Sequence, residues 1–439
     1  MKLKCYTTKL KTLKFVSILG LGFLFCSPYA VASDQALIDV LVKNGYLTET
    51  QAEALSKEAE DIEFSIKGKK VEKVQFSGRL HIQYDNISVD DDTSGGDPSA
   101  VNSFILRRLY LGAKVNLKND WSGTIITRFN DNEADLDKAY IAKKFDDGEF
   151  KFGLRKVNFG YEEGTSSSKI KAVERSLVTR YFNESPNSRR VGIGGRHTGA
   201  YVDGTWNDFG YGAGITNGYH GGDDNESGSN NELGFYGNAF YTIPLQGKKN
   251  KIETGLNLGY QPEGNTDNSD SKAAVVGYNP YVAVNYDRFR LVGEFLGAHV
   301  EDGRRGGSDD ADPFGFNIIP SYKVTDDVEL VFRYSYFDGD GRGMRISDGI
   351  RRANNPDDVE DDIDDDNDPL TSDPIDAFYD MAQAFYFGFN WYIEGNDVKL
   401  SVGYEYADFS DRLNAAGSTF SGGEDAEAHA FRARLQLLF

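Results

Sequence analysis

Along most of the chain, apolar side chains alternate with polar or small ones. In the segment QFSGRLHIQYD at 75–85, Phe76, Leu80 and Ile82 share one face, and the intervening polar residues share the other. Alternation with a period of two is typical of β-strands that have one apolar and one polar face. It predicts sixteen strands, at 75–85, 104–116, 120–129, 136–145, 149–156, 190–206, 209–217, 231–243, 250–261, 273–286, 288–300, 313–324, 327–337, 382–393, 397–409 and 427–439.

Short and long connections alternate between these segments. Tight links such as 118–120, 207–208 and 325–326 join every second pair, whereas most of the others are long and rich in Asp, Gly, Ser and Asn. In lipid, only a closed sheet satisfies every backbone hydrogen bond of a strand. The predicted fold is therefore all-β: a 16-stranded antiparallel transmembrane β-barrel over residues 71–439. A soluble propeller would need a repeat of roughly 40 residues, and the sequence has none.

The N-terminal region has the pattern of a secretory signal peptide. Five lysines precede an apolar run at 15–26, and Ala30-Val31-Ala32 offers a cleavage site, which predicts a signal peptide over 1–32. The apolar run is shorter than the ~20 residues that a spanning helix needs. Lipidation at Cys26 is disfavoured by the bulky Phe25. Residues 33–70 predict a short periplasmic helical segment, in which Thr48 and Gln51 form a capping box.

Composition restricts the cellular location of the protein and the chemistry that its side chains can carry out. Both cysteines, Cys5 and Cys26, lie in the predicted signal peptide, which leaves no thiol for disulfides or catalysis. Its removal takes the formal net charge from −21 to −26, which disfavours a nucleic-acid partner. The five histidines lie in different segments without metal-ligand spacing. We therefore expect no enzyme activity, no cofactor and no metal, and a location in the outer membrane of a Gram-negative bacterium.

The last predicted strand, AHAFRARLQLLF, ends the chain at Phe439. Its apolar residues alternate with Arg432, Arg434 and Gln436, which we expect to face the lumen. An amphipathic final strand that ends in Phe resembles the recognition signal of the outer-membrane assembly machinery. The sequence thus predicts that machinery and the outer-membrane lipid as partners.

An arginine pair interrupts the strand FILRRLYLGAKV at 104–115. If Leu109 and Leu111 face lipid, strict alternation places Arg108 on the lumen face of the strand. It places Arg107 on the lipid face. An arginine facing lipid at mid-bilayer would cost about 2–4 kcal/mol. We therefore expect Arg107 at the extracellular end of the strand, at a subunit interface, or on a bulge that turns it inward.

Several motifs between residues 75 and 180 resemble the phosphate-selective porin O/P family of outer-membrane channels. They are FSGRL around Arg79, LRRLYL around the arginine pair, LDKAYI around Asp137, and KFGLRKVNFGYEEGTSS leading to AVERSL. The resemblance implies a homotrimeric channel for passive diffusion of small hydrophilic solutes, with anions favoured by an arginine lining. It assigns Arg79, Arg107, Arg108 and Arg175 to the lumen wall or an inserted third loop, and Asp137 to the narrow zone.

The expected third loop, about 157–189, carries charges of both signs. Lys169, Lys171 and Arg175 make its second half basic, and we expect them on the anion path. Glu162 and Glu163 reverse the charge of its first half, and Glu163 stands where the family's phosphate porins have a binding lysine. Reversing a charge in a narrow pore is a large electrostatic change. The alternatives are a general or cation-preferring porin, such as one for sugars, or a structural or adhesive outer-membrane barrel.

A strongly acidic stretch, PDDVEDDIDDDNDP, lies within the longest predicted loop. The stretch 357–368 lacks the glycine that an EF-hand loop needs at its sixth position. We expect a solvated loop on the outer side, with divalent-cation binding as the alternative.

Overall fold

The computed structural model describes residues 70–91, 99–130, 133–184, 189–217, 232–247, 249–265, 273–306, 309–353, 377–414, 418–419 and 425–439. The chain divides into two compact units, Met1–Lys69 and Lys70–Phe439, and every described residue belongs to the second. The expected signal peptide, nearly all of the expected N-terminal helical segment and the acidic stretch 357–368 lie outside the described residues. Predictions about them stay predictions.

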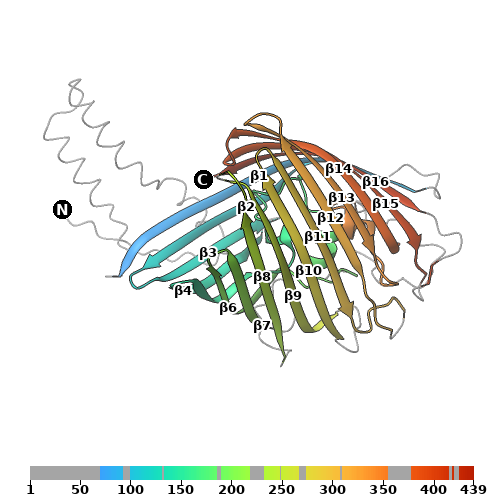
Figure 1. The fold of residues 1–439 in the computed structure, drawn as a ribbon. Helices are drawn as coiled ribbons and strands as arrows, with labels where there is room; N and C mark the ends of the chain where they lie inside the picture. The colour runs from blue at the N-terminus through green and yellow to red at the C-terminus, as the bar shows by residue number, and fades with distance from the viewer. Residues whose placement is uncertain are drawn as a thin grey trace, which may run out of the picture. The chain divides into compact units, whose positions relative to one another are not determined.

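Sixteen antiparallel strands close into one barrel in chain order, with β1 paired to β16 (Figure 1). This confirms the predicted fold class. The strands are β1 Val71–Asp91, β2 Ser99–Leu117, β3 Trp121–Asn130, β4 Glu133–Phe145, β5 Gly148–Lys156, β6 Arg196–Trp206, β7 Phe209–Asn217, β8 Leu233–Pro244, β9 Lys251–Asn265, β10 Ala273–Tyr286, β11 Phe289–Val300, β12 Phe314–Lys323, β13 Val328–Asp338, β14 Tyr379–Glu394, β15 Val398–Arg412 and β16 Ala426–Leu438.

The alternating side chains divide between the two faces of the sheet. Large apolar residues such as Phe76, Ile125 and Phe387 are exposed on the outside of the barrel. Polar residues such as Asn317 and Ser335 are buried on the inside. The tight links between strands use a left-handed backbone, for example at Asn207 with φ 53°. Asn and Asp tolerate that conformation, and it matches the twist of a two-stranded hairpin.

A β-bulge in β2 places the arginine pair. His81 of β1 pairs with Arg108, and Ile82 pairs with Leu106, so that Arg107 is an extra residue without a partner on β1. A bulge sets two residues of one strand opposite one of its neighbour, and the outward phase changes across it. The sequence had left three places open for Arg107, and the structure shows the bulge.

The outward phase of β2 changes at this point. Before the bulge the exposed apolar residues have even numbers, as in Phe104 and Leu106, and after it they have odd numbers, as in Leu111. A second bulge lies in β4, where Ile126 pairs with Lys138 and the next residue of β3 pairs with Leu136. Asp137 is the extra residue there. Both bulges therefore carry residues that the family resemblance had singled out.

The expected strand 190–206 is too long at its start, because β6 begins at Arg196. Gly192 (φ 63°) and Gly195 (φ 91°) adopt left-handed backbone conformations that interrupt regular strand geometry. The VGIGGR motif at 191–196 is therefore mostly the return of the preceding loop, and only its last residue lies in the sheet.

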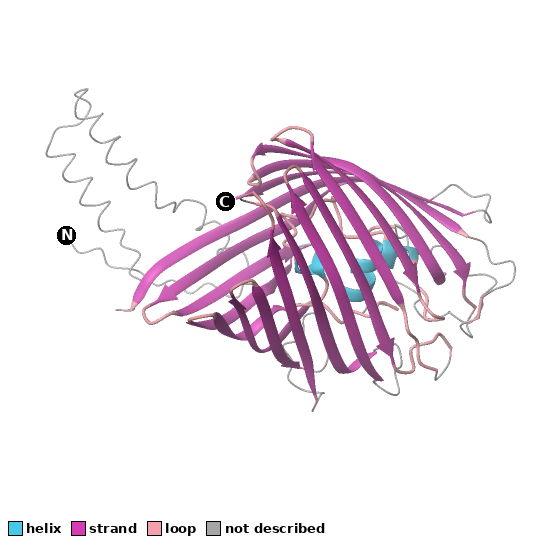
Figure 2. Cartoon of the chain, in the orientation of Figure 1, coloured by secondary structure: helices cyan, strands magenta, loops and turns pink. Residues whose placement is uncertain are grey.

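Within the described residues, three short helices belong to loops, and the strands enclose these loops (Figure 2). They are α3 Tyr161–Gly164, α4 Leu177–Asn183 and α5 Ile346–Gly349. Leu177, Val178 and Tyr181 of α4 are completely buried in an apolar cluster with Phe337 of β13 and Ile346 of α5. This cluster fills part of the lumen with packed side chains. Within the described residues, no helix is long and apolar enough to cross a membrane.

Candidate functional site

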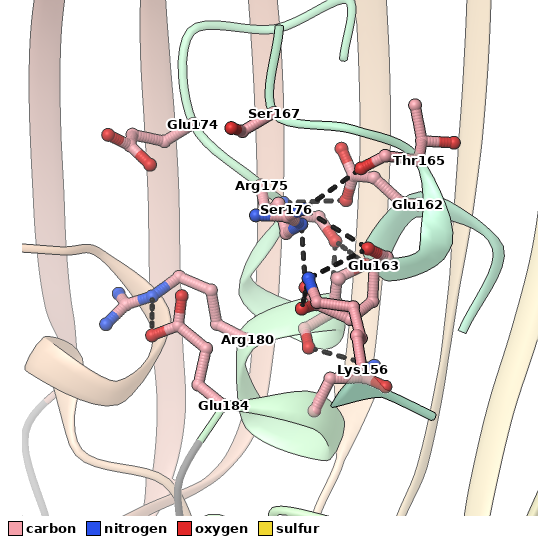
Figure 3. A network of polar contacts seen from close by, with 12 residues as sticks. Lys156, Glu162, Glu163, Thr165, Ser167, Glu174, Arg175, Ser176, Arg180 and Glu184 are labelled. Atoms are coloured by element: carbon pink, nitrogen blue, oxygen red, sulfur yellow. Dashed lines mark hydrogen bonds and ion pairs between the residues drawn. The ribbon is translucent and has the colours of Figure 1, made fainter. Parts of the chain in front are cut away.

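The connection between β5 and β6, residues 157–195, folds into the barrel and forms the inserted loop (Figure 3). Gly160 precedes α3 with φ 79°, and a Cβ there would lie 2.8 Å from the side chain of Asn183. Glycine is thus the residue that allows this turn and its close packing. Ser176 caps α4, because its Oγ accepts the backbone N–H of Thr179 at 3.0 Å.

Hydrogen bonds hold the backbone of the inserted loop against strands β11 to β16. Glu294 of β11 accepts the N–H groups of Tyr161 at 2.9 Å and of Glu162 at 3.3 Å. Asn390 of β14 donates to the carbonyl of Lys171 at 2.9 Å, and Lys399 of β15 donates to that of Ser168 at 2.8 Å. These contacts come from one side of the barrel wall and keep the loop on that side.

Buried ion pairs reinforce this attachment. Arg333 of β13 lies 3.3 Å from Glu162 and 2.6 Å from Glu405 of β15. Lys171 lies 2.7 Å from Glu329 of β13. A buried charge is costly without a partner, so these pairs fix the loop in one position more than they add net stability.

An open cavity of about 820 Å³ remains between the inserted loop and the wall formed by β1 to β6. The cavity is strongly basic: twelve of its lining residues are Lys or Arg, and three are Asp or Glu. The basic residues are Arg79, Arg107, Arg108, Arg128, Lys138, Lys151, Arg155, Lys156, Arg175, Arg190, Arg196 and Arg351. The acidic residues are Asp137, Glu163 and Glu184.

Glu174 of the inserted loop binds both arginines of the β2 bulge. Its Oε1 accepts Nε of Arg107 at 2.6 Å, and its Oε2 accepts Nη2 of Arg107 at 3.1 Å. Nη2 of Arg108 lies 3.5 Å from the same carboxylate. Burial alone would raise the pKa of Glu174, but Arg107 and Arg108 hold that pKa well below its usual range. The carboxylate is therefore ionised at neutral pH.

Glu163 is likewise paired within the cavity wall. Its carboxylate contacts Nζ of Lys156, and its Oε2 lies 2.7 Å from Nε of Arg175 (Figure 3). Burial acts to raise the pKa of Glu163, while Arg175 and Lys156 lower it further than burial raises it. The negative charge of Glu163, which the sequence led us to expect in the narrow zone, is thus compensated by two cations.

The other two cavity carboxylates also have basic partners. Asp137 contacts the guanidinium of Arg196, the first residue of β6. Glu184 contacts Arg351 and lies 3.2 Å from both Arg180 and Arg190. Each acidic group in the cavity is therefore neutralised by basic groups beside it.

Arg79 and Lys138 differ from these paired cations. Arg79 donates to Ser167 Oγ at 2.6 Å and Ser166 Oγ at 3.1 Å, and stacks 5.2 Å from the ring of Tyr110. Within the described part of the chain, no carboxylate lies within 4.0 Å of either Arg79 or Lys138. Their charges are therefore directed at the cavity.

The predicted site residues fall into two groups. Six of the nine line the cavity: Arg79, Arg107, Arg108, Asp137, Glu163 and Arg175. Glu162 and Lys171 are tied to the wall at β13 instead, and Lys169 is exposed outside the cavity lining. The part that these three play in conduction stays a prediction.

Sequence reasoning did not select eight of the twelve basic lining residues, among them Arg128 of β3 and Lys156 of β5. Lys151 and Arg155 alternate with outward-facing Phe150 and Phe152 on β5, so the period of two could have identified them. Lys138 follows Asp137 on the second bulge, and a bulge cannot be read from one strand alone. Arg190, Arg196 and Arg351 lie in or next to loops, where the sequence carries no local signal.

Within the described residues, no group of three or more His, Cys, Asp or Glu side chains is placed to hold a metal ion. The polar groups of the cavity are mainly fixed cations. Such an arrangement attracts anions.

Comparison with known proteins places the whole barrel in one family. The family model for phosphate-selective porin O and P matches residues 74–439. No curated protein matches the chain in sequence.

Three solved structures illustrate the shared fold. An anion-selective porin from Comamonas acidovorans aligns with a TM-score of 0.52 and 12% identity, covering 83% of this chain and 99% of its own. OprB of Pseudomonas putida aligns with a TM-score of 0.52 and 12% identity, covering 88% and 96%. The channel DcaP of Acinetobacter baumannii aligns with a TM-score of 0.50 and 12% identity, covering 83% of this chain and 97% of its own. At such identities the likeness shows the fold alone.

Proposed function

This chain belongs to the phosphate-selective porin O and P family, and from that premise we propose that its channel prefers small hydrophilic anions without being specific for phosphate. Proteins of this family are channels of the outer membrane, so the barrel is an outer-membrane porin. The finer proposal concerns which solutes it favours.

The observation that carries this proposal is the charge of the cavity lining. Twelve basic and three acidic side chains face about 820 Å³ of open space. Several lining cations have partners just outside the lining, such as Asp203 for Lys151 and Arg155, yet the balance stays positive. Beside low-dielectric walls a fixed charge acts more strongly than in bulk water. An anion is therefore attracted to this cavity, and a cation is repelled.

The pairing of Glu163 argues against phosphate specificity. Its carboxylate contacts Lys156 and Arg175, the two cations of the inserted loop and its β5 end that would otherwise be available to a solute anion. A channel conducts well when binding is strong enough to admit a solute and weak enough to release it. Cations that already have a carboxylate partner favour passage of many anions over retention of one.

The partners of the barrel are part of the same proposal. A homotrimer is proposed from the family resemblance. Recognition by the outer-membrane assembly machinery is supported by β16, whose last residues pair with β1 through a hydrogen bond of 2.6 Å from the Gly78 N–H to the Phe439 carbonyl. Contact with outer-membrane lipid is supported by the exposed apolar side chains on the outside of the strands.

Swelling of liposomes that contain the purified protein tests the proposal. Glucose and gluconate have nearly the same size. Valinomycin carries across the bilayer the potassium that must accompany gluconate. We expect both solutes to enter, and gluconate to enter at least about twice as fast because of the basic lining. No swelling would contradict the assignment as an open channel. Slower entry of gluconate than of glucose would contradict the anion preference.

A further inference from the structure

We propose that Glu174 is a specificity-determining residue: its carboxylate is a tethered anion that fills an oxyanion site built by the β2 bulge and β16, and it thereby lowers the anion preference of the channel. This inference rests on the proposed anion-preferring function. The site consists of Arg107, Arg108, Arg434 and His81, and Glu174 enters it from the inserted loop.

The contacts of Glu174 are those of a bound oxyanion. Arg107 donates to both carboxylate oxygens, at 2.6 and 3.1 Å, and Arg108 approaches one of them at 3.5 Å. A planar guanidinium that donates to two oxygens in this way can bind a carboxylate, a sulfate or a phosphate. The bulge makes this possible, because it brings two consecutive arginines to the lumen side of one strand.

The site holds more donors than one carboxylate can satisfy. Nη1 of Arg108 and Nε and Nη2 of Arg434 are buried donors without a hydrogen-bond partner within the described structure. The two ring nitrogens of His81 are also buried and unpartnered, and a neutral ring supplies one N–H donor. Arg434 and His81 are completely buried, on strands β16 and β1 next to β2. Buried donors are normally satisfied. An oxyanion with three or four oxygens would satisfy more of them than Glu174 does.

The backbone around Glu174 is fastened without its side chain. Arg333 donates to the Glu174 carbonyl at 2.8 Å, and Tyr386 Oη accepts the N–H of Val173 at 3.3 Å. Arg434 also donates to the carbonyl of Val173. Because the wall already holds both peptide groups, the carboxylate is not needed to keep the loop in place. Its remaining effect is electrostatic.

Replacing the carboxylate by an amide changes the charge of the site with little change of shape. Three arginines and one glutamate give the wild-type site a net charge of +2, and E174Q gives it +3. The substitution also removes the charged partner of the Arg107 and Arg108 donors, which face the cavity. E174Q should therefore both attract anions more strongly and hold a multivalent one.

The test uses the full-length protein in planar bilayers under a KCl gradient, with inorganic sulfate as the added probe. Relative to wild type, E174Q is expected to raise the chloride-to-potassium permeability ratio roughly threefold or more. Millimolar sulfate is expected to reduce its chloride current in a concentration-dependent way, and to affect wild type much less. An unchanged ratio without sulfate block would overturn the proposal.

Two further variants separate charge from attachment. R107Q/E174Q returns the site to +2 and is expected to restore the wild-type ratio, whereas a lost loop attachment would leave the double variant like E174Q. E427Q removes a half-exposed carboxylate of β16 that does not line the cavity, and is expected to leave sulfate sensitivity at the wild-type level. If E427Q assembles and E174Q does not, the Glu174 carboxylate holds the loop and the proposal is wrong. A cation-preferring wild type would contradict the proposed function, while the shift between variants would still test Glu174.

Discussion

At the scale of single residues, Arg79 is a half-buried cation that lines the cavity of the proposed anion path. It reaches from β1 to two serine hydroxyls of the inserted loop and has no carboxylate partner among the described residues. Arg79→Gln is expected to lower the chloride-to-potassium permeability ratio about twofold, because one unpaired charge leaves the cavity. Arg288→Gln is the matched control: Arg288 is exposed on a turn, 3.2 Å from Asp326, and does not line the cavity. Equal ratios for the two variants in bilayer recordings would refute the role of Arg79.

Residue positions could be predicted from the sequence only where strict alternation holds. Arg79 and Arg108 follow the inward phase of their strands and lie on the lumen side as expected. Arg107 remained ambiguous, because a bulge arises from pairing between two strands and not from the order of residues in one. The two partners of Glu163 could not be predicted either, because Lys156 and Arg175 contact its carboxylate only once the loop has folded back.

At the scale of elements, the bulge in β2 carries one residue more than strict alternation needs. Phe104 and Leu106 are exposed before the bulge and Leu111 after it, so deleting Arg107 leaves all three facing outward. We expect this deletion to give a normal yield of heat-modifiable folded barrel on gels. Deleting Ala213 from β7, which pairs without a bulge, would turn Ile215 inward and is expected to reduce the yield severalfold. Equally low yields for both deletions would contradict this account of the bulge.

The inserted loop shows how far elements can be anticipated. Its existence and its start at residue 157 were predicted, whereas its end lies at 195, because Gly192 and Gly195 keep the chain out of the sheet. Its attachment could not be predicted. Lys171 pairs with Glu329, 158 residues further along the chain, and nothing local in either segment indicates the other. Only closure of the barrel brings such residues together.

At the scale of the whole molecule, all sixteen strands could be predicted, because each carries the same period of two and the chain supplies the short turns between them. The sequence did not show that the lumen is divided. The inserted loop and α5 share an apolar cluster with residues of several strands, including β8, β10, β11 and β13, and the basic cavity lies beside β1 to β6. The division follows from an apolar cluster inside the barrel, which a rule of polar residues inside and apolar residues outside does not anticipate.

The reversal potential of the wild-type channel under a KCl gradient tests the central claim most directly. If the basic cavity controls passage, the zero-current potential lies towards the chloride equilibrium potential, and added phosphate causes little block because Glu163 already neutralises Lys156 and Arg175. A potential towards the potassium equilibrium value would contradict the anion-preferring account, and strong block by phosphate would contradict its lack of phosphate specificity.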